Sequence, residues 1–109
     1  MSPGWRSLAA SLVIAASLPV DASASEEPRA LWIRHCGPCH LQGGTGTFML
    51  GRRLGADKAL LERRDDLTAG YVRAVVRQGI QSMPRFSRAE LPDDLLDRIA
   101  QFLSAPETP

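Results

Sequence analysis

Two cysteines and a histidine stand together in the sequence Cys36-Gly37-Pro38-Cys39-His40. The chain has no other cysteine, so both thiols belong to this one motif. The C-x-x-C-H spacing is that of covalent haem c attachment, in which each thiol adds to one haem vinyl group and the histidine binds the iron. The motif therefore predicts one haem c, bound through Cys36 and Cys39, with His40 as the proximal axial ligand.

The same five residues also fit other kinds of site. Cys-Gly-Pro-Cys resembles the active site of thioredoxins, but the chain lacks the alternating or β-branched runs that the strands of that fold require. A tetrahedral zinc site needs four ligands, and the only histidines, His35 and His40, flank the cysteines on one turn. A structural disulfide between Cys36 and Cys39 is sterically poor except as a redox motif. Haem attachment is therefore favoured, and thiol redox chemistry is its main alternative.

The first 24 residues have the three-part pattern of a secretory signal peptide. Arg6 gives a positively charged start, an apolar run follows over residues 8–20, and Ala22-Ser23-Ala24 is an A-x-A-like cleavage site. The apolar run is shorter than the ~20 residues that a membrane-spanning helix needs. We expect cleavage after Ala24 and export to the periplasm, with an uncleaved anchor as the alternative.

The remaining residues, 25–109, are expected to form a single small domain. Without Arg6 and Asp21 this part of the chain has 12 basic and 11 acidic residues, so it is close to neutral. The charges are interspersed, and no basic stripe indicates a nucleic-acid partner. So short a chain buries only a small core, which a bound haem would enlarge.

Hydrophobic spacing and capping residues predict an all-α fold. A short helix is expected over residues 27–35, leading into a turn that holds the cysteines. Thr68 is a good N-cap for a helix over residues 68–78, and Gly79 is a natural residue to end it. A last helix is expected to open at residues 91–94, which combine proline with two acidic residues. Its buried face is expected to consist of Leu95, Leu96, Ile99, Phe102 and Leu103.

The segments between these helices are expected to be mostly irregular. Residues 43–47 are rich in glycine and are expected to form a loop, and the apolar residues 48–50 are expected to continue it against a hydrophobic surface. Asp57 is expected to cap a short helix that extends to Leu61. Residues 80–86 are expected to be extended, because Pro84 disfavours helical angles at Met83.

A haem bound only by His40 would have an open sixth coordination position. His35 lies on the wrong side of its own attachment turn, and Lys58 is the only lysine. Met83 stands 43 residues after His40 on an irregular segment between two expected helices, from which a thioether can reach the opposite face of the iron. We therefore predict Met83 as the second axial ligand, with Met49 or an open position as alternatives.

Together these features resemble class I c-type cytochromes. The resemblance covers residues 26–104 and consists of the C-x-x-C-H motif, the glycine-rich segment, Met83-Pro84 and the last amphipathic helix. It implies a small all-α cytochrome c fold, with three to five short helices and loops wrapped around one covalent haem c. In this family the first and last helices cross at a small residue and two aromatic residues. Trp32 and Phe102 match the aromatic residues, but Pro28 stands where the usual glycine would be.

A finer resemblance is to the cytochromes that serve flavin- or quinone-cofactor dehydrogenases, such as the cresol and eugenol hydroxylases. It lies in residues 64–67, 71–73, 76–79 and 83–86. It implies a dehydrogenase as electron donor and a downstream cytochrome or oxidase as acceptor.

The expected function is one-electron transfer and not catalysis, because iron bound by both His40 and Met83 has no position free for a substrate. The alternatives are a haem enzyme or a gas or redox sensor with an open or displaceable ligand, and a thioredoxin-like thiol oxidoreductase. A haem enzyme would also need a distal acid–base residue, and no second histidine is free for that role.

Overall fold

A computed structural model describes residues 2–4, 9–19 and 26–104 of the chain. The expected cleavage site at residues 22–24 lies outside the described residues. Residues 2–4 and 9–19 are exposed and belong to no helix or strand. Among the residues described, no helix is both long and apolar enough to cross a membrane.

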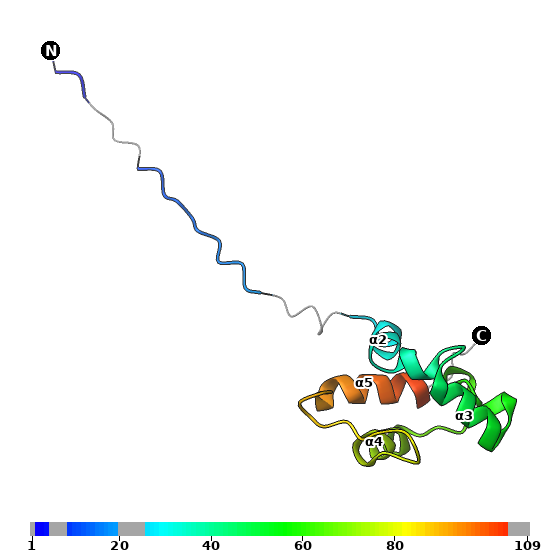
Figure 1. The fold of residues 1–109 in the computed structure, drawn as a ribbon. Helices are drawn as coiled ribbons and strands as arrows, with labels where there is room; N and C mark the ends of the chain where they lie inside the picture. The colour runs from blue at the N-terminus through cyan, green and yellow to red at the C-terminus, as the bar shows by residue number, and fades with distance from the viewer. Residues whose placement is uncertain (1, 5–8, 20–25, 105–109) are drawn as a thin grey trace.

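The fold is all-α, as expected. The described residues form four α-helices and two short 3-10 helices. In chain order these elements are α2 (Pro28–His40), α3 (Thr45–Leu54), η1 (Ala56–Lys58), η2 (Leu61–Arg63), α4 (Ala69–Gln78) and α5 (Asp93–Ser104). Helix α5 contacts both α2 and α4 and lies between them, while α3 packs beside the end of α2 (Figure 1).

One hydrophobic core lies where α2, α4 and α5 meet. Trp32 and Leu31 of α2 are completely enclosed, with Trp32 only 2% exposed. Helix α5 contributes more residues to this core than any other helix, because its apolar residues recur every three to four positions and so lie on one face. The core consists of Leu31, Trp32, Leu67, Val72, Val76, Leu91, Leu95, Leu96, Ile99, Ala100 and Leu103. Phe102, expected in this face, is only partly buried and packs against the core, and Ala100 is buried instead.

Both ends of α4 follow the local signals in the sequence. The side chain of Thr68 accepts a hydrogen bond from the backbone N–H of Tyr71 at 3.1 Å. Gly79 ends the helix with a φ of 72°, a left-handed conformation that favours glycine. The following segment, residues 80–86, is irregular as expected, and Ile80 and Met83 pair in an isolated bridge.

Helix α2 is longer than expected. It was expected to end at His35, but it continues through both cysteines to His40. Pro38 lies in its last turns, where the lost N–H removes one helical hydrogen bond without breaking the helix. The motif is therefore helical and not a separate turn.

The loop expected over residues 43–50 is found only at residues 43 and 44. The prediction is wrong for residues 45–50, which form the start of α3. Gly44 is the N-cap residue, and the helix begins at Thr45. Phe48 and Met49 are 62% and 52% exposed in the described structure, so they are not enclosed by the polypeptide. Asp57 does not act as a cap either, since the 3-10 helix η1 follows Gly55 without a side-chain capping bond.

Candidate functional site

The last turns of α2 position the three residues of the motif. Cys36 and Cys39 are three residues apart on this helix, so their side chains lie on neighbouring positions of one face. Both thiols are free; Cys36 is partly buried against the core and Cys39 is exposed. His40 ends the helix, and the backbone N–H of Leu41 closes it on the carbonyl of Gly37 at 2.9 Å.

The thiols lack the environment of a redox-active pair. Burial, with a smaller contribution from Cys39, raises the pKa of Cys36 to about 11. Both cysteines also stand near the C-terminal end of α2, where the helix dipole disfavours a thiolate. Nucleophilic cysteines of exchange proteins have lowered pKa values and stand at helix N-termini or beside cations. The structure therefore disfavours the thiol-exchange interpretation.

The imidazole of His40 is held from two sides. Its ring lies 5.8 Å from the Trp32 ring, with 32° between the planes. On another side is the start of α3, where a Cβ atom at Gly46 would lie 2.9 Å from Cε1 and 3.1 Å from Nδ1 of His40. Burial lowers the pKa of His40, which keeps the ring neutral and suited to bind a metal. The Nδ1 atom is buried without a hydrogen-bond partner.

The turn between α2 and α3 requires glycine. A Cβ atom at Gly44 would lie 2.4 Å from the carbonyl oxygen of Cys39, a distance that no side chain could tolerate. The Thr47 hydroxyl then donates a hydrogen bond to the carbonyl of Leu41 at 2.8 Å, which fixes α3 against the end of α2. These contacts hold the backbone around His40 in place.

Met83 lies between α4 and α5 in the chain and packs against the same core as Cys36. Its backbone N–H donates to the carbonyl of Ile80 at 2.9 Å, and its carbonyl accepts from the N–H of Ile80 at 3.2 Å. This turn packs closely against Gly79. A Cβ atom at that position would be 2.9 Å from the Met83 carbonyl oxygen. Met83 is partly buried, whereas the alternative ligand Met49 is half exposed on α3.

The arrangement fits a covalently bound haem. Two thiols lie on one helix face, followed by a neutral imidazole whose Cε1–Nδ1 edge is covered and whose Nε2 is the remaining ligand atom. Comparison with known proteins agrees. The family described as cytochrome c oxidase, cbb3-type, subunit III matches residues 23–103. The chain belongs to this family of c-type cytochromes. Its cofactor is haem c.

The cytochrome c subunit of 4-cresol dehydrogenase [hydroxylating] from Pseudomonas putida is 29% identical to this cytochrome over 80 residues. The match covers 72% of this chain and 59% of that subunit, so the chain spans about three fifths of the relative. No solved structure matches the chain significantly.

Glu62 is a residue of the site that the sequence did not reveal. Its Oε1 atom accepts a hydrogen bond from the indole N–H of Trp32 at 2.7 Å, and its Oε2 atom accepts from Nε of Arg29 at 3.2 Å. The carboxylate of η2 thereby satisfies the one polar atom of a buried indole that packs on His40. No local pattern could indicate this pair, because 30 residues separate its members.

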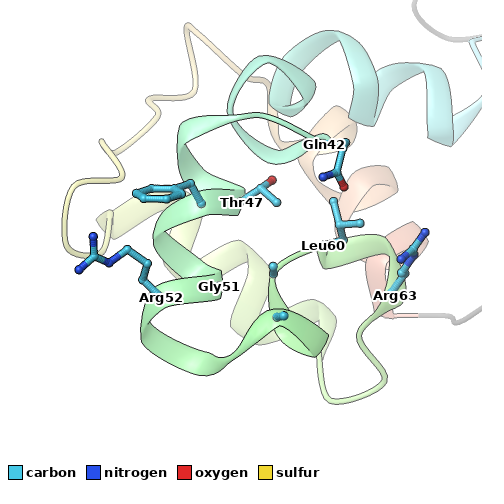
Figure 2. Close-up of a pocket in the computed structure, with 9 residues that line it drawn as sticks. Gln42, Thr47, Gly51, Arg52, Leu60 and Arg63 are labelled. Atoms are coloured by element: carbon cyan, nitrogen blue, oxygen red, sulfur yellow. The ribbon is translucent and has the colours of Figure 1, made fainter.

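A hollow of about 380 Å³ lies between α3 and the two 3-10 helices. Figure 2 shows Arg52 and Arg63 on opposite sides of it. The Arg52 guanidinium also lies 5.7 Å from the centre of the Phe48 ring. The lining residues are Gln42, Thr47, Phe48, Gly51, Arg52, Ala56, Ala59, Leu60 and Arg63. Cys36, Cys39, His40 and Met83 are not among them, so this hollow is not centred on the motif.

Gly46→Ala is expected to destabilise the holoprotein by ~1–3 kcal/mol, because the new methyl group would press on the Cys39 carbonyl and the His40 ring. Urea unfolding followed by circular dichroism measures this loss, and the absorption spectrum should shift with the displaced ring. Gly70→Ala is the matched control, since Gly70 is also helical but has open space around its Cα atom. That change should stabilise α4 by about 0.5–1 kcal/mol. Equal effects of the two substitutions would show that Gly46 does not support His40.

Proposed function

We propose that this cytochrome carries single electrons in the periplasm, with haem c attached through Cys36 and Cys39 and its iron bound by His40 and Met83. The observation that carries the proposal is the motif at the end of α2, where two thiols on one face precede a partly buried, neutral imidazole. The bound haem would supply an iron that changes by one electron between its ferric and ferrous states. The residues around it hold its ligands in fixed positions.

Met83 is the stronger candidate for the second ligand on structural grounds. It is partly buried against the core, and its backbone is fixed by both hydrogen bonds to Ile80. A ligand held in this way loses little conformational entropy when it binds. A thioether also raises the reduction potential of haem iron, which suits an acceptor of electrons.

The haem should resist extraction from the purified, exported protein. Treatment with acidified organic solvent should leave the haem on the polypeptide, and the mass should equal that of residues 25–109 plus one haem. Replacing Cys36 and Cys39 together by Ala should release it. Free extraction from the unaltered protein, or a mass that fits two free thiols, would refute covalent attachment. A mass that retains residues 1–24 would refute cleavage after Ala24.

Met83→Ala should open the iron to external ligands. The oxidised protein should lose its sulfur-to-iron charge-transfer band, the ferrous protein should bind carbon monoxide, and the reduction potential should fall. Met49→Ala is the control, because the half-exposed Met49 side chain lies on α3. A spectrum that is unchanged in Met83→Ala, or changed equally in both variants, would contradict the assignment.

The proposed electron donor is a dehydrogenase with a flavin or quinone cofactor, and the proposed acceptor is a downstream cytochrome or oxidase. The similarity to the cytochrome subunit of 4-cresol dehydrogenase supports this donor class. The proposed contact surface lies around the Met83 segment, where Pro84 and Arg85 are exposed. Arg85 forms no ion pair within the described residues, so its charge is available to steer a partner.

Arg85→Glu should slow the association of this cytochrome with such a donor. The test uses the dehydrogenase subunit of the Pseudomonas putida enzyme with 4-cresol as reductant, and it follows reduction of the cytochrome by stopped flow. The rate should fall at low salt, and added salt should shrink the difference because it screens the charge. Arg53→Glu on α3 is the control, since Arg53 is also exposed and has no ion pair among the residues described. Equal effects would exclude this contact surface, and no reduction at all would exclude this donor.

A further inference from the structure

Arg77 of α4 connects three parts of the fold. Its Nη1 atom donates a hydrogen bond to the backbone carbonyl of Phe86 at 3.1 Å. Its Nη2 atom donates to Oδ1 of Asp93 at 2.7 Å, at the start of α5. One guanidinium therefore joins α4, the segment that follows Met83 and the last helix.

The segment that carries Met83 is bound to α4 at Phe86. The N–H of Phe86 donates to the carbonyl of Val76 at 2.8 Å, so Phe86 is bound to α4 through both its N–H and its carbonyl. Residues 79–85 thereby form a loop that leaves α4 at Gly79 and returns to it at Phe86, and we call it the Met83 loop. Arg77 is the side chain that fastens its far end.

The burial of Arg77 distinguishes it from the surface arginines. Its side chain is only 19% exposed, and its Nε atom is buried without a partner. Arg73, one turn earlier on α4, also pairs with α5, through Asp97 at 3.4 Å, but it is 43% exposed. Exposed pairs of that kind contribute little to stability. A guanidinium that is removed from water requires strong bonds in return, and the loop carbonyl and the Asp93 carboxylate provide them.

Asp93 is itself fixed by two arginines. It also accepts a hydrogen bond from Nε of the exposed Arg88 at 2.8 Å. These bonds, first from Arg88 and then from Arg77, lower the pKa of Asp93 and keep it charged at neutral pH. Asp93, the residue of α5 that binds Arg77, is therefore ionised at neutral pH.

We propose that Arg77 is a positioning residue that holds the Met83 loop closed and so keeps the Met83 thioether in place for the iron. The proposal rests on the ligand assignment made above. Phe86 lies three residues after Met83. Without Arg77, only the bond from the Phe86 N–H to the Val76 carbonyl would hold the loop on the side that the Ile80–Met83 pair does not restrain, so this end of the loop should open more readily. The thioether should then leave the iron before the helices unfold.

The test compares Arg77→Gln with Arg73→Gln in the holoprotein. Both variants remove an arginine that pairs α4 with α5, but only Arg77 contacts the loop. On warming, Arg77→Gln should lose the sulfur-to-iron charge-transfer band at a lower temperature than its helical circular dichroism. In Arg73→Gln the two signals should be lost together. In the reduced protein, the Phe86 amide of Arg77→Gln should exchange its hydrogen about tenfold faster than in Arg73→Gln.

A second variant covers failure to fold. If Arg77→Gln yields no holoprotein, Arg77→Lys is measured in the same way. Lysine keeps the positive charge that faces Asp93, but it lacks the planar guanidinium that donates to Phe86 and Asp93 at the same time. It should also show early loss of the band.

Two results would overturn the proposal. Equal exchange of the Phe86 amide in the Arg77 and Arg73 variants would show that Arg77 does not fasten the loop. If both variants lose the charge-transfer band at the same temperature as the helical circular dichroism, the bond from Arg77 to the loop has no effect on iron ligation. If the charge-transfer band survives in Met83→Ala, the ligand assignment is refuted instead. The exchange of the Phe86 amide does not depend on that assignment.

Discussion

The site depends on the close contact between the end of α2 and the start of α3. Two glycines make this contact possible, since a Cβ atom at Gly44 or Gly46 would lie within 3 Å of the Cys39 carbonyl oxygen. The Thr47 hydroxyl bond to the Leu41 carbonyl then fixes the two helices. His40 lies between this contact and the Trp32 ring, which together bury part of its ring. As the proposed ligand, His40 would need little rearrangement when the charge of the iron changes.

Charged side chains play two different parts in this cytochrome. Pairs such as Arg73 with Asp97 are half exposed and add little stability. Glu62 and Arg77 are more enclosed, and each bonds a group that would otherwise be buried unpaired or left mobile. Glu62 supports the side of His40 through Trp32, while Arg77 supports the side of Met83 through the loop. The two proposed ligands thus rest on two separate polar contacts, each of which joins distant parts of the chain.

Local signals predicted the helices where sequence neighbours decide the conformation. Thr68 and Gly79 limit α4 because a cap and a left-handed glycine act within one turn. The spacing of apolar residues likewise predicted four of the buried residues of α5. The prediction failed for the start of α3, because three glycines and two threonines in residues 43–47 indicate a loop by propensity alone. There the gain from packing against His40 outweighs the low helix propensity of glycine.

The sequence by itself determined the class of cofactor, since the spacing of two thiols and a histidine is a covalent constraint that no folding can alter. It also determined the all-α character, through the period of its apolar residues. Only the tertiary structure decided which charged groups serve the site. Glu62 lies 30 residues from Trp32, and Arg77 lies 9 residues from Phe86. A hydrogen bond between such residues depends on their positions in space, and those positions follow from packing of the helices and not from any pattern within one turn of the chain.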